Sequence, residues 1–156
     1  MLRLVALAAL AGCGFTPAYA PSGGAAKLLG GVQTDDPKTR DDFALTRRLS
    51  ERFGPVESAR YRLSYKVTTR AIGQAITPEN ATTRYSLSGN VDYTLHDIAT
   101  DAVLLTGRAA SFTSWSASGT VVASNAAEED AHRRLMVILA DQIVTKLTAQ
   151  AGSLPQ

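Results

Sequence analysis

The chain has 156 residues, with 16 Lys and Arg against 14 Asp and Glu and a single cysteine. Its length favours one domain, and 45% hydrophobic with 19% charged residues is typical of a globular protein. A formal charge of +2 argues against nucleic-acid binding, while one cysteine excludes an internal disulfide framework and disfavours a zinc site.

The first residues are typical of an export signal. Arg3 precedes a short apolar run over residues 4–10, which is too short to span a bilayer. Leu10-Ala11-Gly12-Cys13 then resembles the bacterial lipobox. This predicts a signal peptide over 1–12, with Cys13 carrying diacylglycerol and an N-acyl chain, palmitate among the acyl groups, as a stable membrane anchor. The alternative is a plain secretory peptide in which Cys13 is incidental. By analogy with enteric lipoproteins, Gly14 favours the outer membrane.

The next residues divide into a tether and a folded unit. Proline and glycine without apolar periodicity predict a lipidated tether over 13–25, followed by a single domain over 26–150 and a tail over 151–156. Residues 27–32 are consistent with a weak first strand. N-cap residue types at 35–39, apolar residues at four-residue spacing and Gly54-Pro55 predict an amphipathic helix over 38–53.

Three strands follow. Apolar and polar residues alternate strictly over 60–68 and again over 84–96. Turn residues at 97–101 precede a less regular third strand over 103–115, and the three are expected to form a meander. Residues 71–80 are expected to form a loop that exposes isoleucines.

A long helix closes the chain. Asn125 and Glu128 have the spacing of a capping box, and an apolar stripe continues to about Ala149. Two helices with one apolar stripe each, and a sheet with one apolar face, predict an α+β two-layer sandwich. In it both helices pack on one face of a mostly antiparallel four-stranded sheet.

Catalytic chemistry is poorly represented. His96 lies beside Asp92 and Asp97, where it could act as a base or metal ligand, although a solvated strand residue is the simpler interpretation. His132 is expected at a boundary between helix and sheet. No catalytic triad, phosphate-cradling glycine motif or metal-ligand cluster is apparent. The protein is therefore expected to be non-enzymatic, with no catalytic residue, metal or cofactor.

A polar strand face remains as the candidate binding surface. Guanidinium and ammonium groups bind phosphates, and hydroxyl groups pair with glycans, although the polar face of an antiparallel sheet can equally be merely solvated. Phe112 and Trp115 are further candidates for docking, with Trp115 expected to fold back on the core. The basic candidates for binding phosphate on this face are Arg60, Arg62, Lys66, Arg70, Arg84 and Arg108.

In this order the segments resemble the LptE family, in its alphaproteobacterial form. The resemblance covers nearly the whole mature chain and rests on residues 13–17, 41–45, 84–89 and 128–136. It implies a lipid-anchored outer-membrane protein that faces the periplasm, plugs the lumen of the LptD β-barrel and helps lipopolysaccharide reach the outer leaflet. The resemblance further implies that the basic candidates contact lipopolysaccharide phosphates or the barrel.

Two alternatives remain open. An auxiliary lipid-binding lipoprotein of an ABC-type transporter could have a similar build, and a periplasmic hydrolase would have to depend on His96. For the basic face, reversing Arg62 and Lys66 to glutamate is expected to weaken lipopolysaccharide binding in a salt-dependent way.

Overall fold

A computed structural model describes residues 24–76, 82–117 and 119–155. The signal peptide, Cys13 and most of the tether predicted from the sequence lie outside these residues. The four strands form one sheet in the order β1-β2-β3-β4, in which β1 is parallel to β2 and the other pairs are antiparallel. The strands are β1 Val32–Thr34, β2 Tyr61–Ile76, β3 Thr82–Asp97 and β4 Val103–Ser116.

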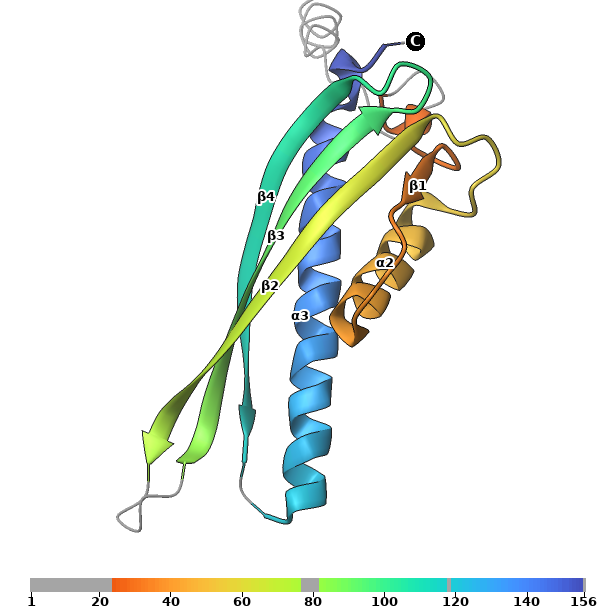
Figure 1. The fold of residues 1–156 in the computed structure, drawn as a ribbon. Helices are drawn as coiled ribbons and strands as arrows, with labels where there is room; N and C mark the ends of the chain where they lie inside the picture. The colour runs from red at the N-terminus through yellow and green to blue at the C-terminus, as the bar shows by residue number, and fades with distance from the viewer. Residues whose placement is uncertain (1–23, 77–81, 118, 156) are drawn as a thin grey trace, which may run out of the picture.

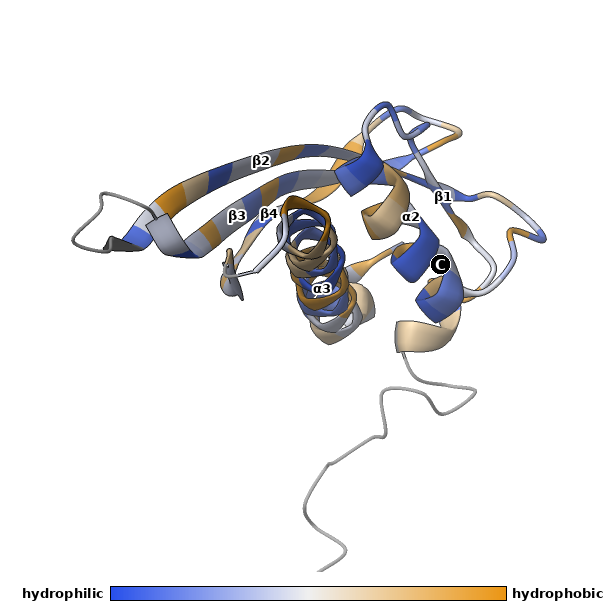
Figure 2. Cartoon of the chain, turned by 90° about the horizontal axis from the view of Figure 1, so that it is seen from below, coloured by the Kyte–Doolittle hydropathy of each residue, from blue (hydrophilic) through white to orange (hydrophobic). Residues whose placement is uncertain are grey.

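Both helices cover the same face of this sheet and leave the other face uncovered by any described segment (Figure 2). The shorter helix, α2, spans Arg40–Phe53, and the longer helix, α3, spans Val121–Gln150 and runs along the sheet (Figure 1). The expected α+β sandwich, its helices and its antiparallel meander are therefore confirmed.

Helix α2 begins and ends where its sequence signals stand. The Thr39 hydroxyl accepts a hydrogen bond from the Asp42 N–H at 3.1 Å, while the Asp42 carboxylate accepts from the Thr39 N–H at 3.0 Å. This reciprocal capping box satisfies N–H groups that have no partner within the helix. Gly54, at φ +81°, takes the backbone conformation that ends the helix.

The first strand lies later than expected. Gly24–Lys27 form a 3₁₀ helix, η1, and β1 begins only at Val32. The two glycines at 30 and 31 lie in the intervening turn, where Gly30 has φ +65°. The prediction of a strand over residues 27–32 was therefore wrong for most of this run. Its apolar residue Leu28 is buried in the core, but it lies in a turn and not in a strand.

The segment expected to be a loop over 71–80 is partly strand. β2 continues to Ile76 and pairs with β3 through a register shift between Gly73 and Ala75. The pairing of β2 with β3 thus extends beyond residues 60–68, where apolar and polar residues alternate strictly. Residues 77–81 lie outside the described residues.

Helix α3 begins earlier than its apparent capping box. The Thr120 hydroxyl accepts a hydrogen bond from the Ala123 N–H at 3.2 Å, so the helix starts at Val121 and Asn125 lies inside it. The motif at 125–128 therefore does not mark the helix start. The first ten residues of α3 contain no fully buried side chain, whereas eight residues of its apolar stripe, from Ala131 to Leu147, are buried.

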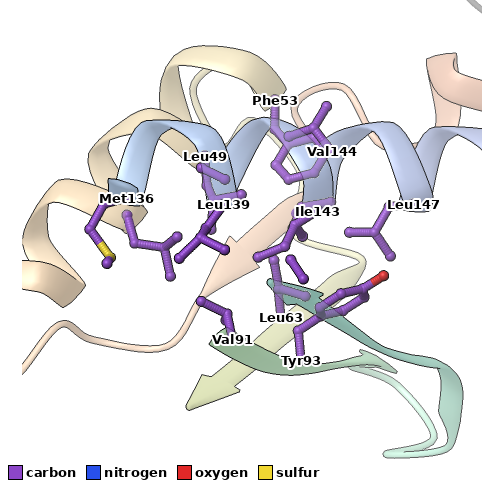
Figure 3. Packing of buried hydrophobic residues seen from close by; sticks show 14 of the residues in the cluster. Leu49, Phe53, Leu63, Val91, Tyr93, Met136, Leu139, Ile143, Val144 and Leu147 are labelled. Atoms are coloured by element: carbon purple, nitrogen blue, oxygen red, sulfur yellow. The ribbon is translucent and has the colours of Figure 1, made fainter. Parts of the chain in front are cut away.

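The core lies between α3, α2 and the inner face of the sheet (Figure 3). α3 buries an apolar stripe from Leu135 to Leu147. An ion-pair cluster joins the two helices outside the core, because Asp141 accepts from Arg48 at 3.0 Å and from Arg52 at 2.7 Å. Other core members are Leu45, Leu49, Phe53, Leu63, Val91 and Tyr93.

The two ends of the described chain meet at one end of the molecule. Ala151–Ser153 form a second 3₁₀ helix, η2, and Leu154 is buried, so the residues expected to be a tail are packed at least to this point. The Lys27 ammonium donates to the Leu154 carbonyl at 2.7 Å. Ala25, assigned to the tether from the sequence, is also buried.

Candidate binding face

The outward face of the sheet, here called the open face, carries the predicted basic residues. The register aligns Lys66, Asp92 and Arg108 in one row across the three long strands, and Arg70, Ser88 and Phe112 in another. Rows four residues apart are separated by about 14 Å along a strand. The open face is thus a surface of cations, hydroxyl groups and a few apolar side chains.

Two of the predicted cations are already paired with carboxylates. Arg62 contacts Asp101 at 3.2 Å, and Arg108 binds both carboxylate oxygens of Asp92, at 2.5 and 3.0 Å. The hydrogen bonds from Arg108 hold the pKa of Asp92 below its ordinary value. These two arginines therefore present much less uncompensated charge than the sequence suggested.

Three other cations on the open face form no such ion pair, although Lys66 lies opposite Asp92 in the register and adds its charge to that of Arg108 in lowering the pKa of Asp92. Within residues 24–76, 82–117 and 119–155, no carboxylate lies within ion-pair distance of Lys66, Arg70 or Arg84. All three side chains are exposed. The sequence placed them on a common face, but only the register distinguishes them from Arg62 and Arg108.

Arg60 lies just before β2, with its guanidinium 5.5 Å from the centre of the Tyr61 ring. A cation over an aromatic face is a weakly attractive contact. The Arg60 carbonyl accepts a hydrogen bond from the Ile98 N–H at 2.9 Å, which places Arg60 at the end of the sheet near the β3–β4 turn, well separated from Arg70 and Arg84.

An apolar component of the open face was not assigned to it from the sequence. Phe112 lies within β4 with 74% of its surface exposed, and Ile72 is exposed on β2. Both occupy the same half of the open face as Arg70. Trp115, in contrast, is buried, as predicted. It also stacks on Tyr85, with ring centroids 4.9 Å apart.

Lys66 borders a shallow hollow of about 620 Å³ on this face. An ammonium group, a guanidinium and several hydroxyl groups can bind phosphate or sugar oxygens. Its polar lining residues include Ser64, Lys66, Asp92, Thr94, Thr106 and Arg108.

His96 is not assembled with the two aspartates beside it in sequence. Asp92 is bound by Arg108, and Asp97 accepts the N–H groups of Ala99 and Thr100, each at 3.0 Å. His96 Nε2 lies 3.3 Å from the Ser64 hydroxyl, while Nδ1 is buried and has no hydrogen-bond partner among the described residues. The arrangement needed for the base or metal-ligand hypothesis is therefore not formed with these aspartates.

His132 contacts the other helix rather than the boundary between helix and sheet. Its Nδ1 lies 2.9 and 3.0 Å from the Asp41 carboxylate oxygens at the start of α2. A groove of about 600 Å³ runs alongside, where Arg40 pairs with Glu129 at 2.5 Å. Because these charges pair across the two helices, the groove is a weaker candidate for anion binding than the open face.

Two features concern the described residues as a whole. No group of three or more His, Cys, Asp or Glu among them is placed to hold a metal ion. None of the helices formed by these residues combines the length and hydrophobicity needed to cross a membrane.

Solved structures share this arrangement of helices and sheet. A candidate lipoprotein from Caulobacter crescentus matches with a TM-score of 0.71 and 20% identity over 83% of this chain and 96% of its own. Rare lipoprotein B from Shewanella oneidensis matches with a TM-score of 0.58 and 12% identity over 77% of this chain and 93% of its own. A minor lipoprotein from Acinetobacter baumannii matches with a TM-score of 0.55 and 20% identity over 77% of this chain and 90% of its own. At such identities the similarity establishes the fold alone.

Comparison of the sequence with known proteins and families identifies the family of this chain. No curated protein sequence matches the chain. A family model described as LptE, lipopolysaccharide-assembly, matches residues 30–147, which is well over half of the chain and includes both helices and the whole sheet up to the last turn of α3. The chain therefore belongs to the LptE family of lipopolysaccharide-assembly proteins.

Proposed function

We propose that this protein is a non-enzymatic lipoprotein of the outer membrane, which assembles with the LptD β-barrel, occupies its lumen and assists insertion of lipopolysaccharide into the outer leaflet. Family membership supports the role in lipopolysaccharide assembly. In this proposal Cys13 carries the diacylglycerol and N-acyl lipid and anchors the protein on the periplasmic side, with no cofactor beyond that covalent lipid.

The observation that carries the proposal is the open face with its unpaired Lys66, Arg70 and Arg84. Phosphate groups on a lipid bind cations that do not first have to leave a carboxylate. Serine hydroxyls along β3 and β4 suit sugar oxygens, and Phe112 offers apolar surface beside the cations. The same polar face is compatible with the wet interior of a large barrel.

Isolation of the full chain from outer membranes, under conditions that preserve the barrel, tests the assembly role. We expect the barrel to co-purify, and mass spectrometry of the N-terminus to find a lipid-modified Cys13. Recovery of the chain without the barrel would contradict the plug. Co-purification with a permease and an ATPase would instead favour the role in an ABC-type transporter.

A further inference from the structure

The outer edge of β2 is covered along only a short part of its length. β1 pairs with residues 61–63 of β2, and the Asp35 N–H adds one hydrogen bond to the Leu63 carbonyl at 3.0 Å. From there β2 continues to Ile76 with no described strand on its outer side (Figure 1). Most of this edge is therefore open to another strand.

The pairing shows which backbone groups face the open edge. Along a strand, the N–H and C=O groups of alternate residues point to the same edge. Tyr61 and Leu63 direct theirs toward β1, since the Tyr61 N–H donates to the Gly31 carbonyl at 2.9 Å and the Leu63 carbonyl accepts from Asp35. The backbone groups of the next four alternate residues make no hydrogen bond with the rest of the described chain. These residues, here called the free edge, are Tyr65, Val67, Thr69 and Ala71.

The opposite edge of the sheet, along β4, is partly closed by α3. The Lys146 ammonium donates to the Arg108 carbonyl, and the Arg134 guanidinium donates to the Ser114 carbonyl at 3.3 Å. Basic side chains placed on an edge strand hinder the approach of a further strand. Strand addition is therefore favoured at β2 over β4.

A hollow of about 430 Å³ adjoins the free edge. Its lining combines Tyr65, Val67 and Thr69 of β2 with the segment before α2 and the first turn of that helix. Asp35 and Asp36 belong to this lining and are exposed, and neither carboxylate makes an ion pair or hydrogen bond to another described residue. The remaining charged lining residues are Lys38, Lys66, Asp41 and Asp42.

The charges of the hollow favour a basic occupant. Its four carboxylates outnumber its two ammonium groups. Asp41 already contacts His132, and Asp42 is held in the α2 cap. Asp35 and Asp36 are therefore the carboxylates left to pair with a new cation. Neighbouring strands lie only about 4.8 Å apart, so a lysine or arginine on an added strand is long enough to reach them.

We infer that the free edge binds an extended segment of the barrel partner as an added strand, and that a lysine or arginine of this segment pairs with Asp35 or Asp36. The inference rests on the proposed assembly with the barrel. Backbone hydrogen bonds give such a strand its affinity, and side-chain contacts give it specificity. Long loops of a barrel can fold into its lumen, so a chain that occupies the lumen can meet one there. An added strand continues the sheet in its own plane, which leaves the open face exposed.

Hydrogen exchange of single amides in the full chain tests the pairing. Rates are compared between the chain alone and its complex with the barrel. We expect the amides of Val67 and Thr69 to slow about tenfold or more in the complex, because each gains a hydrogen bond. The Thr68 amide, which faces β3, should be slow in both samples. The matched control is the outer edge of β4, where the amides of Ala110 and Phe112 should keep their rates.

A proline variant tests the backbone contribution. Thr69→Pro removes an N–H group on the free edge but no hydrogen bond to β3, and edge strands tolerate proline. It should lower the amount of barrel recovered with the chain about fivefold or more. Ala110→Pro makes the same change on the β4 edge and should leave the recovery unchanged. The exchange pattern needs no substitution, so it decides the question if thermal unfolding shows that a proline variant has lost its fold.

A charge variant tests the role of the hollow. Asp35→Asn combined with Asp36→Asn should lower the recovery of barrel about fivefold, and the difference should shrink as the salt concentration rises. Glu57→Gln combined with Glu128→Gln removes the same charge from exposed residues outside the hollow and should have no such effect. Equal losses in the two double variants would overturn the assignment of the basic segment to the hollow.

The possible failures are distinguishable. Unchanged exchange at Val67 and Thr69 in a complex that contains the barrel would overturn the strand addition and leave the assembly role intact. Equal slowing at both edges of the sheet would indicate general exclusion of water and would also overturn it. Slowing in the chain alone, increasing with its concentration, would assign the free edge to a second copy instead. A chain that purifies without the barrel would overturn the proposed function together with this contact.

Discussion

Removal of the unpaired cations on the open face should weaken lipopolysaccharide binding much more than removal of equal charge elsewhere. In the triple variant Lys66→Gln, Arg70→Gln and Arg84→Gln, three side chains without carboxylate partners lose their charge. A basic residue close to an anionic lipid surface contributes about 1 kcal/mol. The three together therefore predict a loss of about 3 kcal/mol, or roughly 150-fold in Kd.

The assay is titration of the full chain with purified lipopolysaccharide at two salt concentrations. The wild-type affinity should fall with salt more steeply than that of the triple variant, because screening removes interactions that the variant no longer makes. All three side chains are exposed, so thermal unfolding should change little.

A control variant changes the net charge by the same amount on the helical layer. Arg40→Gln, Arg47→Gln and Arg133→Gln remove exposed cations from α2 and α3 that pair there with Glu129, Glu51 and Asp130. We expect a loss in affinity of less than about threefold, since only screened long-range attraction changes. Equal losses in the two triple variants would refute a site on the open face, as would full affinity in the first.

Three further predictions concern the scaffold. Gly89→Val should destabilise the fold by about 1–3 kcal/mol, because a Cβ there would lie 2.8 Å from the Leu135 Cδ2 atom; an unchanged urea midpoint would show that the helix can yield. Thr39→Ala should cost about 1 kcal/mol through loss of the α2 cap, and Thr39→Ser should restore most of it; equal stability of the two would contradict the capping role. Burial, with nearby aspartates as a smaller cause, raises the pKa of Tyr65 to about 12. An unfolded tyrosine ionises near pH 10, so stability should fall as the pH rises from there to about 12, and Tyr65→Phe should remove this part of the loss and the late step in the ultraviolet phenolate titration.

The secondary structure was largely readable from local patterns. Alternation at Tyr61, Leu63 and Val67 predicts β2 because successive side chains in a strand point to opposite faces. The signals at Thr39 and Gly54 bound α2 because they act on neighbouring backbone groups. The same local logic failed at Asn125, where a capping spacing occurs inside a helix that Thr120 already caps.

The composition of the candidate site was only partly predictable. The period of two places Arg62, Lys66 and Arg70 on one face, but it says nothing of which carboxylate lies opposite each. Pairing of Arg108 with Asp92 follows from the β3–β4 register, and pairing of Arg62 with Asp101 follows from the turn that joins those strands. Phe112 was predicted within the third strand, but only the register shows that it lies in one row with Arg70 on the open face.

The sequence by itself determined the element types, the two-layer α+β class and the set of basic residues on one sheet face, since these depend on periodicity and on contacts within a few residues. Only the tertiary structure decided which of these cations form no ion pair and which apolar side chains lie beside them on the open face. Both depend on strand register, which aligns residues far apart in the chain such as Arg70, Ser88 and Phe112, and no local pattern encodes them.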